Sequence, residues 1–339
     1  MGSYAICLIP GDGIGPEVVS CARRVLEALV THPSGLSFMF EEHPAGHDSY
    51  RASDEALPAK TIAAAKAADG VLAGAMDVAA IPRQVPNPLS GLRRQLDVFA
   101  NLRPARTFRG VPARGGEMNM MVVRENTEGI YSGIEYSAGP DAACGVRLIT
   151  RKASTRVARA AFEQAMKRRR KVTAVHKLGA LKLTDSLFLE SVQSVADEFP
   201  EVEYETRNVD ACALEMVQNP AHFDVILATN TFGDILSDIG AGLAGGLGLA
   251  PSGCFGEQFA YFEPVHGSAP DIAGRGIANP IATILSAAFM LRHLNEPEAA
   301  TQIEQAVERV LEAGSPRTPD LGGSATSAEF TDALVKALG

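Results

Sequence analysis

Tryptophan is absent from the 339-residue sequence, and aromatic residues make up only 6% of it. Long apolar stretches are missing as well. The longest mostly apolar stretch, Ile281–Leu291, has 11 residues, whereas a membrane-spanning helix needs roughly 18–20. The N-terminal segment shows neither a basic region nor a small-residue cleavage site, so no signal peptide is visible. These absences predict a cytoplasmic protein without a membrane segment.

Cysteine and positive charge are also scarce. The five cysteines are scattered, with no CxxC pair and no Cys/His cluster, which favours reduced thiols that pack as small core residues. Lys and Arg number 31 against 40 Asp and Glu, a net charge of −9. This balance argues against nucleic-acid binding and suits a small ligand held in a local basic pocket.

The rest of the composition is that of a globular protein, 46% hydrophobic and 21% charged. The chain exceeds the ~250–300 residues at which a single core stops growing, so two domains are expected. Short β-rich runs alternate with helical patterns, which predicts an α/β fold. Expected strands span 4–9, 70–73, 118–123, 172–175 and 224–228, and expected helices span 16–30, 281–291 and 298–312, with a further helix capped at Ser154 or Thr155.

A glycine-rich turn, residues 11–15 (GDGIG), lies between the first expected strand and the first expected helix. It lacks the third glycine at the interval of a Rossmann dinucleotide motif, and Pro16 follows it. Asp12 would also face a bound pyrophosphate. The pattern therefore favours glycines that permit a tight turn over phosphate contacts, and by itself it leaves the function open.

Four longer motifs follow: LRRQLDVFANLRP at 92–104, VRENTEGIYSG at 123–133, TFGDILSD at 231–238 and EPVHGSAPDIAG at 263–274. Together they closely resemble the isocitrate/isopropylmalate/homoisocitrate dehydrogenase family, the metal-dependent β-decarboxylating dehydrogenases. The resemblance runs from Ile9 to Ser324. It implies a two-domain α/β fold with non-Rossmann dinucleotide binding. A terminal domain of residues 1–98 and 245–339 would carry the cofactor loop, and a central domain of residues 99–244 would carry the metal ligands and the dimer contact.

Three arginines in these motifs, Arg93, Arg103 and Arg124, suit a substrate with several carboxylates, because guanidinium groups pair with carboxylates through two parallel hydrogen bonds. Within the family motifs they are expected to hold a small di- or tricarboxylate hydroxy acid. Leu89 and Ser90 lie in the segment that sets substrate specificity in the family.

Asp234 and Asp238 are spaced i,i+4, so on a helix both carboxylates point from one face. Two hard oxygen ligands suit Mg²⁺ or Mn²⁺, although a helix cap followed by a surface ion pair has the same spacing. The resemblance implies that Asp210 is the third metal ligand and that it comes from the partner subunit. It thus implies a homodimer with shared active sites, or a higher oligomer.

The same resemblance gives Tyr131 and Lys177 the proton-transfer roles. Lys177 would assist removal of the C2 hydroxyl proton of a (2R)-hydroxy acid as hydride leaves for NAD⁺. Tyr131 would supply a proton at C3 once the β-carboxylate has departed as CO₂.

The segment 266–272 resembles the adenosine-binding loop of the family. Asp271 can accept hydrogen bonds from both ribose hydroxyls and would repel a 2′-phosphate, which favours NAD over NADP. NADP-preferring relatives carry Lys-Tyr in place of Asp271-Ile272. The residues expected at the cofactor are Asn126, His266, Gly267, Ser268, Ala269, Asp271, Ile272 and Asn279.

Two segments depart from the family pattern. Gly179 replaces the Asn that normally lies near the nicotinamide, and residues 85–91 (VPNPLSG) match no subfamily. Leu89 is similar to isopropylmalate enzymes, whereas residues 125–128 (ENTE) favour the isocitrate and homoisocitrate enzymes. We therefore expect a substrate with a polar or acidic γ-substituent.

Two alternatives stay open. One is a tartrate- or D-malate-type dehydrogenase. The other is a non-catalytic regulatory subunit of a heteromeric isocitrate dehydrogenase. Such a subunit would be expected to lack a metal-binding Asp or the Lys/Tyr pair, and this sequence has them all.

Overall fold

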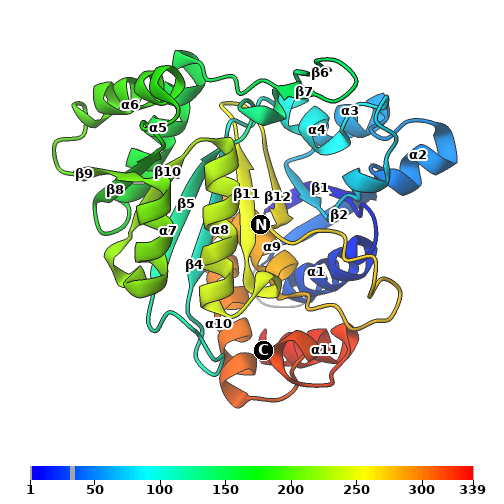
Figure 1. Ribbon diagram of the computed structural model, residues 1–339. Coiled ribbons are helices and arrows are strands. Elements are labelled where there is room, and N and C mark those ends of the chain that lie inside the picture. Colours follow the sequence, from blue (N-terminus) through cyan, green and yellow to red (C-terminus); the bar gives the residue numbers. More distant parts are fainter. Residues whose placement is uncertain (1, 31–34, 339) are drawn as a thin grey trace.

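A computed structural model describes residues 2–30 and 35–338. Within those residues ten strands form one sheet, in the order β2-β1-β3-β12-β11-β4-β5-β10-β8-β9 (Figure 1). Its strands are β1 (Ser3–Ile9), β2 (Ser37–Glu42), β3 (Gly70–Ala73), β4 (Ala100–Arg106), β5 (Asn119–Glu125), β8 (Lys171–His176), β9 (Glu203–Asn208), β10 (Val225–Ala228), β11 (Pro251–Phe255) and β12 (Ala260–Pro264). β6 (Glu135–Ser137) and β7 (Ala143–Gly145) form a separate antiparallel hairpin.

The sheet has two halves built from different parts of the sequence. β2, β1, β3 and β12 run parallel to one another, as do β5, β10, β8 and β9. Between them β11 and β4 pair antiparallel with each other and with their outer neighbours. Strands from residues 99–244 therefore make one half, and strands from the two ends of the chain make the other. Because one sheet runs through both halves, we retain the two-domain division as a proposal.

Helices cover both faces of each half. In the terminal half, one face of the sheet carries α1, α9, α10 and α11, and the other face carries α2, α3 and α4. In the middle half, one face carries α5 and α6, and the other face carries α7 and α8. The helices are α1 (Gly15–Val30), α2 (His47–Ser53), α3 (Ala59–Ala67), α4 (Pro88–Gln95), α5 (Arg151–Met166), α6 (Lys182–Ala196), α7 (Val209–Gln218), α8 (Asn230–Ala244), α9 (Ile281–His293), α10 (Pro297–Ala313) and α11 (Ser327–Leu338).

Burial on both faces explains why the strands are continuously apolar. In β5, Met121 and Val123 pack toward α5 and α6, whereas Met120 and Val122 pack toward α7 and α8. The α/β fold and the expected strands are confirmed. The apolar run at 281–291 forms the buried helix α9, and no helix within the described residues is long and apolar enough to cross a bilayer.

One expected cap is wrong. α5 is capped by Thr150, whose Oγ1 accepts the N–H of Ala153 at 3.2 Å, and both Ser154 and Thr155 lie inside the helix. Thr150 has extended backbone dihedrals, and its hydroxyl also donates to Glu128 at 2.8 Å. That partner is 22 residues away in sequence. The contact with Glu128 is not visible in the local sequence pattern.

The glycine turn is a tight packing element, as expected. Gly13 has φ +62°, and a Cβ there would lie 2.0 Å from the carbonyl oxygen of Ser268. That oxygen accepts the N–H of Ile14 at 2.9 Å. The buried Asp12 carboxylate faces the start of α2 and accepts the backbone N–H groups of His47, Asp48 and Asp77 at 2.8, 2.9 and 2.7 Å. The turn thus supports the loop that begins at residue 266.

Candidate active site

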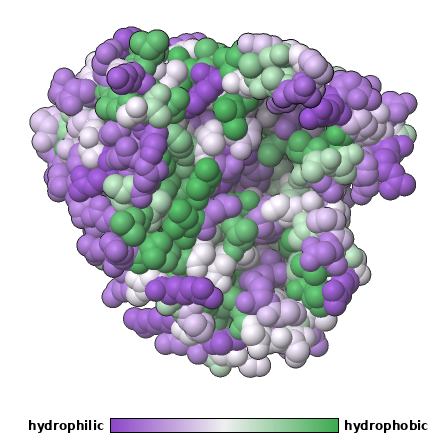
Figure 2. All heavy atoms as spheres, in the orientation of Figure 1, coloured by the Kyte–Doolittle hydropathy of each residue, from purple (hydrophilic) through white to green (hydrophobic). Residues whose placement is uncertain are grey.

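Three guanidinium groups converge in one cleft where the two halves of the sheet meet. Arg93 comes from α4, Arg103 from β4 and Arg124 from the end of β5, and all three are buried. The cleft has a volume of about 190 Å³ and is lined also by Leu89, Tyr131, Asp234 and residues 263–267. It lies on the sheet face that carries α4 and α8, and the surface is hollowed beside α8 (Figure 2). Such a cluster can bind more than one carboxylate.

Asp234 is the carboxylate at the centre of this cluster. Its Oδ1 accepts Arg103 Nη1 at 3.0 Å and also pairs with Arg124, and its Oδ2 accepts the Tyr131 hydroxyl at 2.8 Å. Burial opposes the ionisation of Asp234, but the charges of Arg124 and Arg103 outweigh it and hold the pKa of this carboxyl below its usual value. Asp234 is therefore an anion in the folded protein at neutral pH.

Arg124 is the most deeply buried of the three arginines, with 1% of its surface exposed. Its Nε and Nη2 donate to Asn230 Oδ1 at 3.1 and 2.7 Å. Burial, and then the charges of Arg103 and Arg93, lower the pKa of Arg124 to about 10. The guanidinium stays charged at neutral pH, so the crowded cluster keeps a strong attraction for an anionic ligand.

Arg93 belongs to a buried network that the sequence analysis missed. Its Nη2 pairs with Glu263 at 3.1 Å, its Nε donates to Tyr261 at 3.1 Å, and the Tyr261 hydroxyl donates to Glu263 at 2.9 Å. Two further unassigned residues, Asn101 and Ser237, accept hydrogen bonds from Arg103. The available signal was the presence of polar residues inside the otherwise apolar buried strands β4 and β12.

The specificity segment contributes one side chain to the cleft. Leu89, in the first turn of α4, lines it. Ser90 is buried, and its N–H donates to the capping Asn87 Oδ1 at 3.0 Å. The cleft therefore meets an aliphatic side chain at the position where substrate specificity is expected to be set.

Tyr131 lies in the short 3-10 helix Ile130–Ser132, directly after Gly129. The Arg124 guanidinium carbon is 5.2 Å from the centre of its ring. Burial, and then the charge of Asp234, raise the pKa of the Tyr131 phenol. The phenol therefore keeps its proton at neutral pH and can act as a proton donor.

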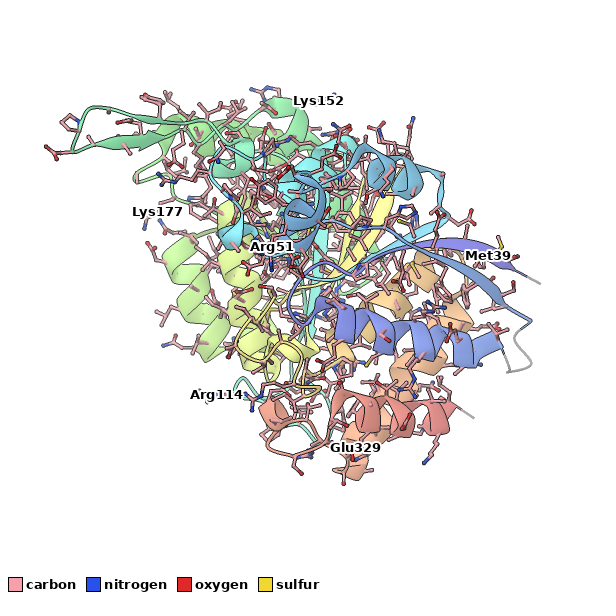
Figure 3. The ribbon with its side chains drawn as sticks, turned by 90° about the vertical axis from the view of Figure 1, so that its right-hand side faces the viewer. Met39, Arg51, Arg114, Lys152, Lys177 and Glu329 are labelled. Carbon is pink, nitrogen blue, oxygen red and sulfur yellow. The ribbon has the colours of Figure 1, made fainter. Side chains whose placement is uncertain are left out.

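Lys177 and Asp210 form a second group, away from the arginines. Lys177 follows β8 and its Nζ pairs with Asp210, the second residue of α7, whose side chain is 68% exposed. Figure 3 shows Lys177 at the edge of the molecule. The structure thus brings Lys177 to Asp210 and Tyr131 to Asp234, but it does not bring these two pairs together within one chain.

Asp238 follows Asp234 by one helical turn. Partial burial, and then the charge of Asp234, raise the pKa of its carboxyl. Among the described residues its carboxylate has no hydrogen-bond or ion-pair partner, and no group of three or more His, Cys, Asp or Glu side chains is close enough to hold a metal ion. One chain therefore presents two adjacent carboxylates on α8 and a third, Asp210, elsewhere.

The expected cofactor residues lie beside the cleft. His266 and Gly267 line it, burial lowers the pKa of His266, and the buried His266 Nε2 has no partner among the described residues. Asn126 is buried with its Oδ1 likewise unpaired, while its Nδ2 donates to the Val98 carbonyl at 3.1 Å. Orphaned polar atoms of this kind indicate an unfilled ligand contact.

The remaining residues expected at the cofactor differ in whether their polar atoms already have partners within the chain. Asp271 is exposed at the tip of the loop, and Ala269 holds a positive φ of 40°. Asn279 already uses both ends of its amide, donating to Asp320 at 2.8 Å and accepting the Ile281 N–H at 3.0 Å. Asp271 is therefore exposed to solvent, whereas Asn279 has its polar atoms engaged within the chain.

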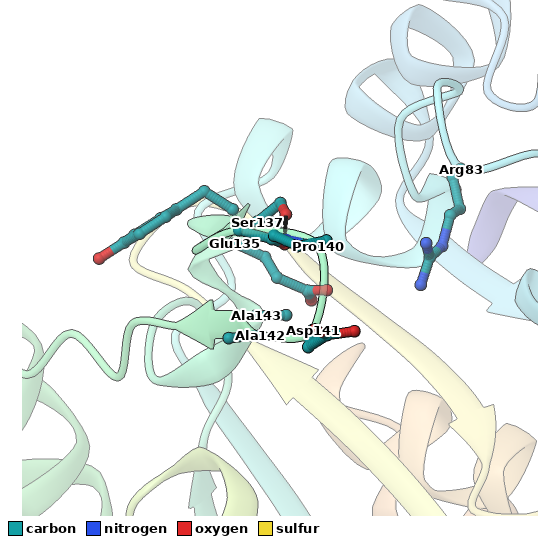
Figure 4. A pocket seen from close by; sticks show the side chains of 10 residues that line it. Arg83, Glu135, Ser137, Pro140, Asp141, Ala142 and Ala143 are labelled. Carbon is teal, nitrogen blue, oxygen red and sulfur yellow. Dashed lines mark hydrogen bonds between the residues drawn. The ribbon is translucent and has the colours of Figure 1, made fainter.

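A larger hollow of about 860 Å³ lies beside the β6–β7 hairpin (Figure 4). Arg83 lines it on one side and Glu135 and Asp141 on the other. None of the three clustered arginines lines this hollow, so the smaller cleft is the candidate active site.

The fold is α/β, and the cleft presents three guanidinium groups suited to an anionic small molecule. The model of the isocitrate/isopropylmalate dehydrogenase family matches residues 5–334, and the chain belongs to this family. It is therefore an oxidoreductase that catalyses the oxidative decarboxylation of a small hydroxy acid.

Individual relatives agree with this assignment. The isocitrate/homoisocitrate dehydrogenase of Thermus thermophilus is 50% identical, with 99% of each chain covered. A mitochondrial protein of Arabidopsis thaliana named "Isocitrate dehydrogenase [NAD] catalytic subunit 5" is 41% identical over 96% of this chain and 86% of its own. The crystal structure of isocitrate dehydrogenase from Methylococcus capsulatus is 43% identical and superposes with a TM-score of 0.93 over 100% of this chain and 99% of that one.

Proposed function

We propose that the chain oxidises a (2R)-hydroxy-3-carboxy acid with NAD⁺ and releases the 3-carboxylate as CO₂, in a site shared by two copies of the chain. The observation that carries the proposal is the convergence of Arg93, Arg103 and Arg124 on a cleft that also contains Tyr131. Three guanidinium groups, partly balanced by Asp234 and Glu263, suit a substrate with two or three carboxylates.

The residues present fit both a divalent cation and a dinucleotide. The carboxylates of Asp234 and Asp238 are hard oxygen ligands one helical turn apart, and Asp210 would supply a third. The unpaired His266 Nε2 and the exposed Asp271 would meet the adenosine end of NAD. When bound, NAD⁺ accepts the hydride and Mg²⁺ or Mn²⁺ polarises the oxygen at C2.

The side chains of the protein divide the remaining work. Arg93, Arg103 and Arg124 hold the substrate carboxylates and fix the orientation of C2 and C3. Lys177 takes the proton of the C2 hydroxyl during oxidation. Tyr131, which keeps its phenolic proton at neutral pH, delivers a proton to C3 after CO₂ has left.

Two copies are needed because the groups lie apart in one chain. Lys177 and Asp210 of one copy would complete the site around Tyr131, Asp234 and Asp238 of the other. The large apolar side chains of Leu214 and Val217 on α7 and Ile235 on α8 are each more than half exposed. An apolar stripe is visible over these two helices in Figure 2. A second copy that packs there would cover the stripe.

For the substrate we propose an isocitrate- or homoisocitrate-type acid, with a polar or acidic γ-substituent. Leu89 in the cleft supports the 3-isopropylmalate alternative, because an aliphatic side chain favours an aliphatic γ-group. A tartrate- or D-malate-type dehydrogenase is the second alternative. We further propose that the protein works in the cytoplasm.

The deciding experiment compares kcat/KM for isocitrate, homoisocitrate, 3-isopropylmalate, D-malate and tartrate with NAD⁺ and Mn²⁺, with CO₂ measured for each. We expect isocitrate or homoisocitrate to lead, with one CO₂ released per NADH formed. A preference for 3-isopropylmalate would overturn the substrate assignment. Oxidation of D-malate or tartrate as the best substrate would favour the second alternative, and no oxidation of any acid would favour the regulatory subunit.

The two proton-transfer roles can be separated by a half-reaction. Tyr131→Phe should slow overall turnover by about 10²–10⁴-fold, the usual contribution of a general acid or base. It should still reduce the supplied 2-oxo-3-carboxy intermediate with NADH. Lys177→Met should impair that reduction, because the reverse step needs a proton from Lys177. Equal loss of the half-reaction in both variants would contradict this division of roles.

A further inference from the structure

A buried ion pair behind the candidate site, Arg147–Asp185, has no place in the proposed reaction. Asp185 lies in the first turn of α6 with its side chain 0% exposed, and Arg147 Nη1 pairs with it at 2.7 Å. A carboxylate removed from water to this degree destabilises the fold unless its oxygens are fully bonded. The contacts of this pair therefore indicate what it holds in place.

Asp185 holds the backbone of Lys177. Its Oδ2 accepts the Lys177 N–H at 2.6 Å, while the Lys177 carbonyl accepts the N–H groups of Ala180 and Leu181 at 2.9 and 2.8 Å. Both backbone polar groups of Lys177 are thus fixed, although its ammonium group lies at the edge of the molecule. Asp185 thus fixes the backbone from which the Lys177 side chain extends.

Arg147 extends the link to α8. Its Nη2 donates to Thr229 Oγ1 at 3.0 Å, and its guanidinium carbon lies 5.3 Å from the centre of the Phe232 ring. Thr229 is the N-cap of α8, the helix that carries Asp234 and Asp238. A single guanidinium therefore spans from the carboxylate that holds Lys177 to the start of the helix that holds the metal-binding carboxylates.

The same segment is tied to Tyr131. Leu148, the neighbour of Arg147, exchanges two backbone hydrogen bonds with Gly129, at 2.9 and 3.2 Å. Gly129 is the N-cap of the short 3-10 helix that carries Tyr131. Arg147 thus lies where the supports of Lys177, Asp234 and Tyr131 meet.

We propose that Arg147–Asp185 is a positioning pair that links the Lys177 group to the Tyr131/Asp234 group of the same chain. This inference rests on the proposed function, in which the two groups serve different active sites of a dimer. The pair thereby holds parts of both sites in place within one chain.

The variants in this test separate the two-sided hydrogen bonding of the Arg147 guanidinium group from its positive charge. Arg147→Lys keeps the charge but cannot bond Asp185 and Thr229 as a fork. Arg147→Met alone would leave the buried Asp185 charge unpaired and destabilise the fold. The double variant Arg147→Met/Asp185→Asn removes both charges and avoids that problem. Arg151→Met is the matched control, because Arg151 also pairs with an acidic residue of α6, Glu190 at 3.1 Å, but at the exposed surface.

Two readouts are needed. In turnover, Arg147→Lys and the double variant should lose about 10–100-fold in kcat, as expected for small misplacement of reacting groups, with KM for the hydroxy acid changed by less than about 3-fold. In hydrogen exchange of the protein without substrate, amides in both segments 177–185 and 229–236 should exchange about 10-fold faster or more. Arg151→Met should match the wild type in both measurements.

Faster exchange confined to residues 177–185 would overturn the link, because Arg147–Asp185 would then serve Lys177 alone. An unchanged kcat in both Arg147 variants would overturn the positioning role. The exchange measurement needs no substrate or cofactor. A failure of the proposed function, seen as absent hydroxy-acid oxidation by the wild type, is thus distinguishable from a failure of this inference.

Discussion

The arginine cleft and the Lys177–Asp210 edge are both assigned to catalysis, yet they are built in opposite ways. In the cleft Arg93, Arg103 and Arg124 are at most 6% exposed, and each is bonded to at least two side chains. At the edge the Lys177 side chain is 33% exposed and that of Asp210 68% exposed, and they pair with each other. The arginine cleft is buried and preorganised, whereas the Lys177–Asp210 edge is accessible at the surface.

The difference follows from what each group has to do. Charges that orient a polycarboxylate act most strongly where water is excluded, so the chain buries them in a bonded network. Groups that complete a neighbour's site must be accessible before the two copies meet. Under the proposed function, one chain carries two unlike half-sites, and burial distinguishes them.

The largest effect should come from removing the carboxylate at the centre of the cleft. Asp234→Asn should lower turnover by about 10³-fold or more, because it would remove a charged ligand of the proposed metal ion, whose polarisation of the C2 oxygen is worth several kcal/mol of transition-state stabilisation. It also takes the charge partner from Arg103 and Arg124, so the variant should be less stable to urea. Asp238→Asn should lose metal-dependent turnover while keeping wild-type stability. Near-normal activity with tight Mn²⁺ binding in either variant would contradict the metal assignment.

The division into two half-sites can be tested by mixing inactive subunits. Lys177→Met and Tyr131→Phe should each be nearly inactive alone, but every hybrid dimer should contain one site with both residues intact. After full subunit exchange we expect about a quarter of wild-type activity, since half of the dimers are hybrids with one working site of two. Exchange is verified separately with a tagged Lys177→Met subunit, because Lys177→Met mixed with wild type keeps half of the activity whether or not the subunits exchange. No recovery after exchange is verified would mean that the site is not shared.

At the cofactor loop, kcat/KM for NAD⁺ should exceed that for NADP⁺ by about 10²-fold or more, because an unpaired 2′-phosphate would face the Asp271 carboxylate. Asp271→Asn should reduce this NAD⁺/NADP⁺ ratio, mainly by raising kcat/KM for NADP⁺. Asp141→Asn, in the exposed β6–β7 hairpin, should leave the ratio unchanged. Equal use of both dinucleotides by the wild type would overturn the assignment.

A smaller change is expected at the edge, where Gly179 departs from the family pattern. A Cβ added there meets no atom within 4 Å, and Gly179 is not among the glycines with positive φ, so Gly179→Asn should fold normally. An added hydrogen bond near the nicotinamide should lower KM for NAD⁺ by about 2–10-fold. Unchanged KM with unchanged Tm would show that residue 179 does not reach the cofactor.

The smallest effect concerns stability in acid. The pKa of Asp234 is depressed in the folded protein, so its stabilising contribution is present above its unfolded pKa of about 3.9 and is lost as the pH falls through its folded value. The stability difference between wild type and Asp234→Asn should be constant near neutral pH and narrow below about pH 4. The side chain is 35% exposed, so the narrowing should be modest and weaker in high salt. Urea unfolding of both proteins at several pH values measures this stability difference. A difference that grows as the pH falls would contradict a depressed pKa for Asp234.

Much of the fold could be predicted from local patterns. Residues 70–73 form β3 with the expected limits, and the helix expected at 298–312 differs from α10 by one residue at each end. Asp234 and Asp238, whose i,i+4 spacing would place both carboxylates on one face of a helix, do lie on one helix, α8. The cap of α5 was expected four or five residues too late: Thr150 caps the helix through the nearby Ala153 N–H, and its further contact with Glu128 depends on the tertiary fold.

The sequence by itself determined the α/β class, the family and the residue types that can carry the chemistry, because periodicity and motif spacing report interactions between near neighbours in the chain. The tertiary structure alone decided the pairings. Arg93 meets Glu263 across 170 residues, and Lys177 lies apart from Tyr131 although the resemblance assigns both to one reaction. Such contacts depend on the order of strands in the sheet and on which face each helix covers, and neither is encoded in a local pattern.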